Sequence, residues 1–218
     1  MSGSEALIDT RKFKGKMIAI VGIGGLGCTV SMLLARQGIN LMLIDGDIVE
    51  KSNLERQVLF DVEDIGKPKS EVAARRLECF SEITSVFDTI TEKNTVILDG
   101  ADLIIDCTDN METRMVIDNF SREKRVPWIH SAGVKEIGTL FFIDPSREER
   151  ATFKDFAEGK EGESACSVGV MNTTVSIVGA LAAKMAVDYL TKGSYPEGMM
   201  RVDLSGLEIS QYGVKKDG

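Results

Sequence analysis

The chain has 218 residues, of which 43% are hydrophobic and 28% are charged, and its formal net charge is −8. This length suffices for one large globular domain, and the apolar content excludes a disordered chain. The acidic balance argues against general nucleic-acid binding, and the apolar segments are too short and broken to predict a signal peptide or a membrane span. We therefore expect one domain over residues 1–218, cytoplasmic, with neither nucleic acid nor membrane as a partner.

Cysteine and histidine usage gives no metal-binding pattern. The four cysteines are widely spaced without a C-x-x-C pair, and His130 is the only histidine in the chain. Zinc sites and disulfide scaffolds both need closer or more numerous ligands. The sequence therefore predicts neither a structural zinc nor a disulfide framework.

The first secondary-structure signals form a strand, helix, strand unit. MIAIVG at 17–22 is a continuous apolar run that ends on glycine, which is typical of a strand buried on both faces. GGLGCTVSMLLARQG follows with helical spacing and a glycine where a C-terminal cap belongs, and LMLID at 41–45 predicts a second buried strand. Such a unit favours a parallel sheet.

The same alternation continues to the C-terminus. Further helices are expected over 67–80, in NMETRMVIDNFSREK and from about 169 to 190, and further strands over 102–107, in VPWIHSAG, over 139–144 and as two pieces of MRVDLSGLEISQY hinged at Gly206. Residues 145–164 are charged and lack periodicity, which predicts a long loop of the kind that is often functional. The predicted fold class is α/β, a Rossmann-like doubly wound and mostly parallel sheet with helices on both faces.

The first site signal is a glycine-rich turn between the first strand and its helix. Its G-x-G-x-x-G pattern comprises Gly22, Gly24 and Gly27, with Gly25 between them, and Asp45 ends the next strand 23 residues after Gly22. Glycines let the backbone turn tightly and let a phosphate approach the N–H groups of the helix, while the carboxylate can accept both ribose hydroxyls. We interpret this as a nucleotide site, although the motif does not specify which nucleotide.

Cations follow the second strand, where a dinucleotide would need none. The segment DGDIVEKSNLERQVLFDVEDIGKPK carries Asp47, Asn53, Arg56 and Lys69, and it leaves the strand edge at which ligands bind in such sheets. Taken singly, Arg56 or Lys69 is more often a solvated surface charge. Two cations beside a glycine turn nevertheless favour a ligand with more phosphate charge than NAD.

An acidic element follows the strand at 102–107. Asp109, in the run DCTDN, is expected to face the same crevice, where a carboxylate opposite phosphates is tolerated when Mg²⁺ lies between them. The alternative is that Asp109 or Asn110 merely caps the following helix. Together with the glycine turn and the cations, the pattern suggests Mg-ATP.

These motifs resemble the E1-like family of adenylating enzymes, which includes the ThiF, MoeB and HesA proteins. The resemblance runs from about residue 14 to residue 212 and rests on GIGGLG, DGDIVEKSNLERQ, IGKPKSEVAARRL, CTDN and GVMNTTVSIVGALAAKMAVDYL. It implies that a substrate carboxylate attacks ATP to give an acyl-adenylate and pyrophosphate, and that the chain forms a homodimer. It also implies the residue roles: Asp45 for the ribose, Asn53, Arg56 and Lys69 for the triphosphate, and Asp109 for magnesium.

The sequence also departs from this family. The two C-x-x-C pairs of the zinc-binding members are missing, and so is the N-terminal R-Y-x-R-Q motif that reaches across the dimer, for which only Arg11 offers a substitute. Cys166 lies close to where ThiF-like members carry a reactive cysteine, although a buried structural cysteine is the simpler interpretation. His130, expected at the end of its strand, and Lys135 are candidates for substrate contact or for ordinary structural roles.

Two substrate classes and one different activity stay open. The acyl substrate is either the C-terminal glycine of a ubiquitin-fold sulfur carrier or a small organic acid, such as the guanylylpyridinol precursor of the [Fe]-hydrogenase cofactor. The long loop at 145–164 is expected to cover this substrate. The alternative activity is an NAD-binding oxidoreductase or a non-catalytic nucleotide-binding module, which would require Arg56 and Lys69 to point away from the crevice.

Overall fold

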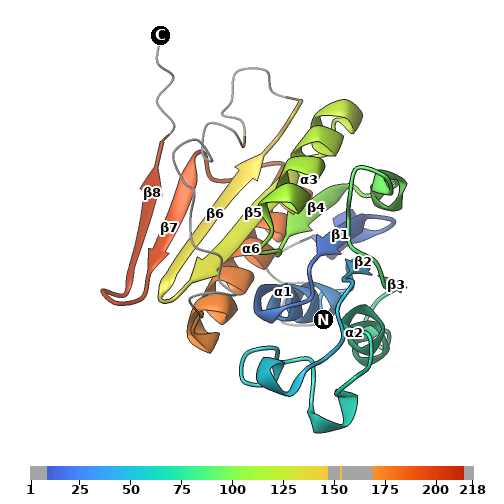
Figure 1. The fold of residues 1–218 in the computed structure, drawn as a ribbon. Coiled ribbons are helices and arrows are strands. Elements are labelled where there is room, and N and C mark those ends of the chain that lie inside the picture. Colours follow the sequence, from blue (N-terminus) through green and yellow to red (C-terminus); the bar gives the residue numbers. More distant parts are fainter. Residues whose placement is uncertain (1–8, 147–152, 154–168, 214–218) are drawn as a thin grey trace.

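The computed structural model describes residues 9–146, 153 and 169–213, which form one eight-stranded sheet with helices on both faces (Figure 1). The strand order is β3-β2-β1-β4-β5-β6-β7-β8. The strands are β1 Met17–Val21, β2 Asn40–Ile44, β3 Ile83–Val86, β4 Leu103–Asp106, β5 Trp128–Val134, β6 Ile137–Ile143, β7 Met199–Asp203 and β8 Glu208–Tyr212. The first five strands of this order pair in parallel and the last three pair antiparallel, which confirms the predicted doubly wound α/β class.

Helices cover the sheet from both sides. They are α1 Gly25–Ala35, α2 Lys69–Leu77, α3 Met111–Lys124 and α6 Asn172–Lys192, joined by the 3-10 turns η1 Thr10–Phe13, η2 Lys51–Asn53, η3 Val62–Asp64 and η4 Thr95–Leu98. Along β1, Ile18 and Ile20 face a core shared with α1, α2 and α6, whereas Ala19 and Val21 face a second core shared with α3. This alternation is the period of two expected of a strand that is buried on both faces.

The strand order reverses beside β1. From β1 the chain moves outward to β2 and β3 and then returns to β4 on the other side of β1. In open parallel sheets a crevice forms at such a switch point, at the carboxyl ends of the strands. The switch lies where the glycine turn after β1 and the acidic run after β4 meet, because Gly22 follows β1 and Cys107 follows β4.

Several sequence-based boundaries differ from the structure. The helix expected over 67–80 begins at Lys69, with Pro68 as its N-cap, and ends at Leu77, while the helix expected from about 169 begins at Asn172. The expectation that His130 ends its strand is wrong: it is the third residue of β5, because antiparallel pairing with β6 extends β5 to Val134. Strand β3, a short edge strand with two exposed positions, was missed. The sequence had predicted the final two-strand hairpin correctly.

Helix α6 deserves comment because it is long and apolar. By length and composition it is the one described helix that passes the test for a membrane span, but half of its most apolar window is buried, and a core helix passes the same test. Its buried residues include Val178, Ala182 and Ala186, which belong to the core that also contains α1. Half of this apolar window is thus covered within the chain, by the core that α6 shares with α1.

Candidate nucleotide-binding site

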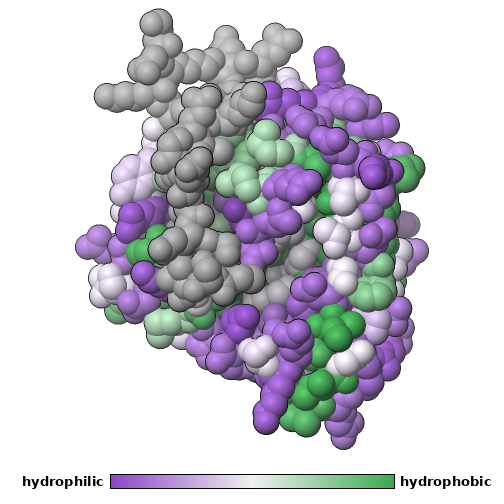
Figure 2. Space-filling view, viewed as in Figure 1, coloured by the Kyte–Doolittle hydropathy of each residue, from purple (hydrophilic) through white to green (hydrophobic). Residues whose placement is uncertain are grey.

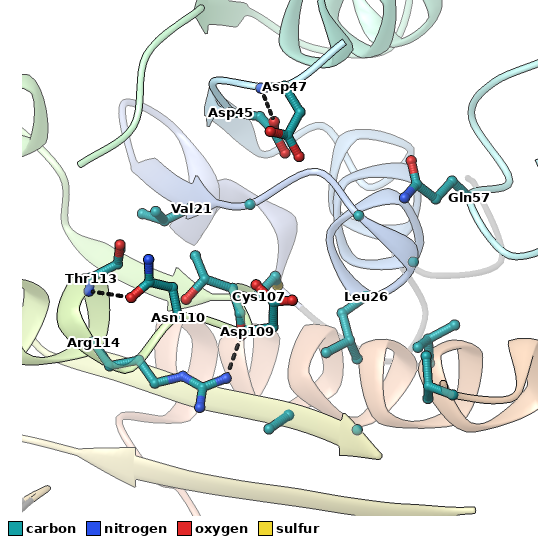
Figure 3. Close-up of a pocket in the computed structure, with 18 of the residues that line it drawn as sticks. Val21, Leu26, Asp45, Asp47, Gln57, Cys107, Asp109, Asn110, Thr113 and Arg114 are labelled. Atoms are coloured by element: carbon teal, nitrogen blue, oxygen red, sulfur yellow. Dashed lines mark hydrogen bonds between the residues drawn. The ribbon is translucent and has the colours of Figure 1, made fainter. Parts of the chain in front are cut away.

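A cavity of about 1210 Å³ opens at the switch point of the sheet. Single small-molecule sites commonly occupy about 300–1,000 Å³, so this cavity has room for a nucleotide and part of a second ligand. We call its two sides the β1–β2 wall, which comprises the glycine turn, Asp45 and the segment 47–69, and the β4–β6 wall, which comprises Cys107 to Asn110, Arg114, His130 and Phe141. Figure 3 shows Asp45 and Asp47 on one side of the loop that precedes α1, and Asp109 and Arg114 on the other.

The glycines of the turn are required for different structural reasons. Gly22 has a φ of +90° and packs against the backbone of Cys107, and a Cβ atom at Gly27 would overlap the carbonyl oxygen of Gly22. A Cβ at Gly25 would lie 2.8 Å from Val175 of α6. Only at Gly24 would a Cβ enter open space, with the Gln57 amide nitrogen 3.9 Å away. Gly22, Gly24 and Gly25 line the cavity, whereas Gly27 serves helix packing and does not line it.

Helix α1 presents its N-terminus to this space. Gly24 is its N-cap and no side chain caps it. The first N–H groups of a helix have no intrahelical acceptor, and the helix dipole places partial positive charge there. This end of α1 is therefore suited to an anion.

Asp45 lies at the end of β2 and is buried beside the turn. Its two carboxylate oxygens accept hydrogen bonds from the backbone N–H groups of Ile23, at 2.6 Å, and Asp47, at 2.7 Å. Burial raises the pKa of Asp45 above its ordinary value, although Lys69 and these two N–H groups oppose the shift. Each oxygen keeps a second lone pair, so the carboxylate can still accept hydroxyl groups of a ligand.

The segment after β2 brings the predicted cations to the cavity. Lys69 is buried at the start of α2, and its Nζ lies 2.8 Å from Asp47 Oδ2. Arg56 lines the cavity as well, and its Nη1 donates to the carbonyl of Ser52 and to Glu55. Asn53 is buried on the same wall and accepts from the N–H of Glu50, which fixes η2. The residues predicted from this segment are thus brought together on the β1–β2 wall.

The acidic run after β4 separates into a cap and a cavity residue. Asn110 is the N-cap of α3 and accepts from the N–H groups of Glu112 and Thr113. Asp109 is exposed and lines the cavity. The sequence left open whether Asp109 or Asn110 caps the following helix, and in the structure the cap is Asn110. Cys107 also lines the cavity, but burial raises the pKa of its thiol far above the ordinary range, which makes it a poor nucleophile.

The residues predicted to contact the substrate differ in whether they line the cavity. His130 is buried but lines the cavity. Lys135 is in the turn between β5 and β6, where its backbone bonds Gly169 and Met171, and its side chain is not among the residues that line the cavity. Arg11 pairs with Asp9 on an exposed surface. Cys166 and most of the loop at 145–164 lie outside the described residues.

Two cavity residues were missed by the sequence reasoning. Gln57 is 4% exposed, and its Oε1 is buried without a hydrogen-bond partner among the described residues. Arg114 reaches the cavity from the first turn of α3. Gln57 directly follows Arg56 in the motif NLERQ, so adjacency was an available signal, whereas nothing local marks Arg114.

Across the described residues, no group of three or more histidine, cysteine, aspartate or glutamate side chains is arranged to hold a metal ion. This finding concerns sites made by the protein alone. Mg²⁺ usually takes one or two carboxylates together with phosphate oxygens and water, so a magnesium site completed by a nucleotide needs no such group.

Comparison with known proteins gives a family match. The model of the ThiF family matches residues 6–216. The chain is 33% identical over 208 residues to the Sulfur carrier protein ThiS adenylyltransferase of Escherichia coli, covering 93% of this chain and 80% of that protein. It is 35% identical over 186 residues to the Molybdopterin-synthase adenylyltransferase of Haemophilus influenzae, covering 81% and 75%. It is also 31% identical over 179 residues to the SAMP-activating enzyme E1 of Haloferax volcanii, covering 79% and 66%.

Solved structures support the fold. The chain is similar to a crystal structure of Escherichia coli MccB with AMPCPP and MccA, with a TM-score of 0.82 and 22% identity over 94% of this chain and 65% of that one. It is similar to the crystal structure of PaaA with a TM-score of 0.79 and 21% identity, covering 95% and 66%. The chain therefore spans about two thirds of the length of these two structures, and at this identity the likeness concerns the fold alone.

Proposed function

Because the chain belongs to the ThiF family, we propose that it is an ATP-dependent adenylyltransferase that activates a carboxylate as an acyl-adenylate and releases pyrophosphate. The observation that carries the proposal is that Arg56 and Lys69 share one cavity with the uncapped N-terminus of α1. The Escherichia coli and Haemophilus influenzae relatives described above are named adenylyltransferases, which supports the same reaction.

The reaction suits the side chains of the cavity. The substrate carboxylate attacks the α-phosphorus of ATP, a new O–P bond forms, and the bond to the leaving pyrophosphate breaks. A carboxylate with a pKa near 4 is already ionised at neutral pH, so the step needs no general base. It needs in-line positioning and neutralisation of charge on the phosphates, which helix N-termini and cations supply.

We assign the roles along the β1–β2 wall from the ribose to the phosphates. Asp45 accepts the ribose hydroxyls, with Asp47 beside it, and the turn at Gly22, Gly24 and Gly25 receives phosphate at the N-terminus of α1. Arg56 and Lys69 bind the triphosphate together with Asn53. Gln57 adds its amide next to Gly24.

The lining of the cavity also includes a carboxylate that would hold a magnesium ion. Asp109 is an exposed carboxylate that lines the cavity, and carboxylate and phosphate oxygens are the ligands Mg²⁺ prefers. When bound, the ion would neutralise phosphate charge. Asp109 would hold it through its carboxylate.

For the acyl substrate we favour the C-terminal carboxylate of a ubiquitin-fold sulfur carrier over a small organic acid. The support is that the Escherichia coli relative is named for the sulfur carrier ThiS and the Haemophilus relative for molybdopterin synthase. The hydrogenase cofactor precursor has no such support.

ATP–pyrophosphate exchange tests both the reaction and the substrate class. We expect exchange with a glycine-terminated carrier such as ThiS, and none with the same carrier lacking its terminal glycine. Exchange with small acids only would show that the acyl substrate is a small organic acid. Absence of exchange with every carboxylate, combined with reduction of NAD by a candidate substrate, would support the oxidoreductase alternative.

We also propose a homodimer, as expected from the family resemblance. The exposed apolar side chains of Val58, Val62 and Ile65 lie in the segment around η3 and offer an apolar contact surface. Figure 2 shows hydrophobic residues at the lower end of the face in view, where Figure 1 places this segment. Sedimentation equilibrium tests the proposal, since a strict monomer at micromolar concentration would contradict it.

A further inference from the structure

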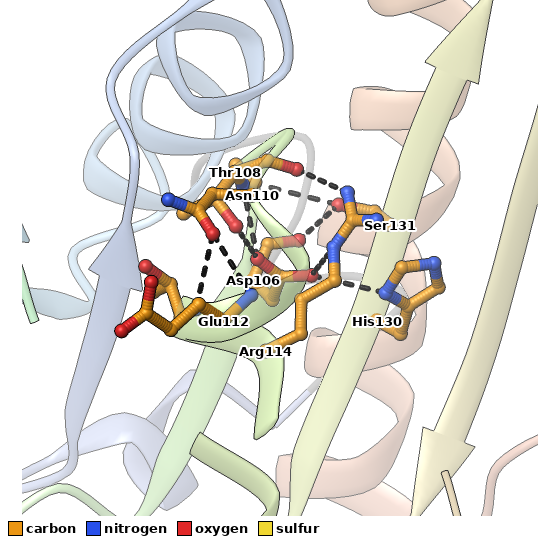
Figure 4. Close-up of polar contacts among 9 residues, drawn as sticks. Asp106, Thr108, Asn110, Glu112, Arg114, His130 and Ser131 are labelled. Carbon is orange, nitrogen blue, oxygen red and sulfur yellow. Dashed lines mark hydrogen bonds and ion pairs between the residues drawn. The ribbon is translucent and has the colours of Figure 1, made fainter. Parts of the chain in front are cut away.

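A buried polar network on the β4–β6 wall has no part in the nucleotide roles described above. Its centre is Asp106, which is fully buried at the end of β4. Its carboxylate accepts hydrogen bonds from the backbone N–H of Thr108, at 3.0 Å, and from Arg114 Nε, at 3.1 Å, and lies 3.0 Å from His130 Nδ1. Figure 4 shows Arg114 and His130 meeting this carboxylate from α3 and β5.

The network holds the Arg114 guanidinium in one orientation. Nε donates to Asp106, and Nη2 donates to the carbonyl oxygen of Thr108. The side chain is 11% exposed and lines the cavity. Within the described part of the chain, Nη1 has no hydrogen-bond partner. A planar guanidinium fixed on two sides keeps its remaining donors pre-organised for a ligand oxygen.

Asp106 remains charged in this setting. Burial would raise its pKa, but the Arg114 guanidinium and the hydrogen bonds from His130 and Thr108 hold the pKa of Asp106 below its ordinary value. An ionised carboxylate that is buried this deeply is expected to be paired. Asp106 therefore both balances the charge of Arg114 and fixes its position.

The position of Arg114 along the sheet edge separates it from the nucleotide residues. The strands run in the order β2, β1, β4, β5, and Arg114 bonds Asp106 at the end of β4, so it lies two strand spacings, or about 10 Å, from the end of β2 that carries Asp45. With the ribose at β2 and the phosphates at the turn after β1, the next anion toward β5 meets Arg114. Beyond Arg114 the wall continues with His130 and Phe141, whose ring centroids are 4.6 Å apart.

From this arrangement we propose that Arg114 binds the carboxylate of the acyl substrate, and that Asp106 is its positioning residue. The proposal rests on the adenylation function proposed above. Attack on ATP brings two anions together, and the two cations of the β1–β2 wall lie on the nucleotide side. Arg114 supplies oriented guanidinium N–H donors at the junction, and hydrogen bonds from a guanidinium to a carboxylate are among the strong ones.

The same helix offers a matched control. Arg122, two turns further along α3, donates to the buried Asp118 at 2.6 Å, and neither residue lines the cavity. Substitutions of the two pairs remove the same kinds of group, an arginine of α3 and the buried aspartate that it contacts, which lies on β4 for Arg114 and on α3 for Arg122. The Arg122 side chain is 45% exposed and that of Arg114 is 11% exposed, so the control variants report the loss of an arginine–aspartate pair away from the cavity.

The test measures the binding affinities of two ligands by calorimetry. The first probe is AMP, which carries the α-phosphate alone. The second is 5′-O-(N-glycylsulfamoyl)adenosine, whose acyl carbonyl and ionised sulfamate stand where the substrate carboxylate has joined the nucleotide. The variants are Arg114→Lys, which keeps the charge but not the planar fork, Asp106→Asn, and the controls Arg122→Lys and Asp118→Asn.

We expect Arg114→Lys to weaken the acyl analogue by roughly 10- to 100-fold, the size of one or two lost charge-assisted hydrogen bonds, and to leave AMP within about twofold. Asp106→Asn should likewise weaken the acyl analogue and leave the affinity for AMP unchanged. Both control variants should bind both ligands with wild-type affinity. Equal weakening of AMP and the analogue would overturn the proposal, since Arg114 would then bind the α-phosphate or support the fold.

Unchanged binding of both ligands would overturn it as well. If a variant unfolds, the affinities for AMP and for the acyl analogue are compared in the double variant Arg114→Gln/Asp106→Asn, which leaves no unpaired buried charge. Failure of the wild-type protein to bind AMP or ATP at all would instead count against the adenylation function itself.

Discussion

The two walls of the cavity position their positively charged groups by different means. The β1–β2 wall presents backbone N–H groups at the start of α1 and cations from one continuous segment, 47–69. The β4–β6 wall presents a guanidinium whose orientation depends on a carboxylate on β4 and which shares that carboxylate with a histidine on β5. The first is built from neighbours in sequence and the second from residues brought together only by the sheet. Substitutions on one wall should therefore impair the binding function of that wall and leave that of the other wall intact.

The largest effect is expected on the β1–β2 wall. Arg56→Ala and Lys69→Ala should each lower adenylation roughly 10²-fold or more, because each removes one pre-organised charge from the reacting phosphates. Pyrophosphate exchange measures the loss. Arg75→Ala, an exposed cation on the same helix as Lys69, is the control and should keep full activity.

Full activity of either variant would show that its residue had been misassigned. Lys69 carries a second expectation, because it is buried beside Asp45 and opposes the upward shift of the pKa of that carboxyl. Lys69→Ala should therefore raise the pKa of Asp45 further.

A pair of glycine substitutions separates folding from binding on this wall. Gly27→Ala should destabilise the protein by about 1–3 kcal/mol or more, since the new methyl group overlaps the Gly22 carbonyl. Gly24→Ala should fold normally and bind ATP less tightly, because its methyl group enters the open cavity. Thermal unfolding and calorimetric titration give the two readouts, and a reversed pattern would contradict the assignment of the phosphate to Gly24.

A smaller effect is expected at Gln57. Its amide lies beside Gly24, so Gln57→Ala should weaken ATP about tenfold, through the loss of one hydrogen bond to a charged group. Gln37 likewise has a buried Oε1 without a partner among the described residues, but it does not line the cavity. Gln37→Ala is thus the control. Equal ATP affinity of the two variants would remove Gln57 from the site.

The smallest effect concerns acid pH. The pKa of Asp106 is lowered in the folded protein, so its ionisation adds stability above the ordinary aspartate pKa, and this stability is lost as pH falls through the lowered value. Denaturant unfolding of wild type and Asp106→Asn should therefore differ at neutral pH and converge in strong acid. A difference that is independent of pH would show that the charge of Asp106 is not what stabilises the fold.

The difference between the walls also explains what the sequence could predict. The turn, Asp45 and the segment to Lys69 are within 50 residues of one another, and their spacing alone indicates a nucleotide site. The pairing of Asp106 with His130 depends on the parallel register of β4 and β5, which no local pattern encodes. His130 was assigned to a strand end, whereas antiparallel pairing with β6 across a two-residue turn continues β5 to Val134.

We propose that the β1–β2 wall binds a triphosphate in preference to a dinucleotide. Calorimetric titration of the wild-type protein with ATP in the presence of Mg²⁺, and separately with NAD, tests this directly. We predict that Mg-ATP binds more tightly, because Arg56 and Lys69 meet phosphate charge that NAD lacks. Tighter binding of NAD than of Mg-ATP would contradict the account.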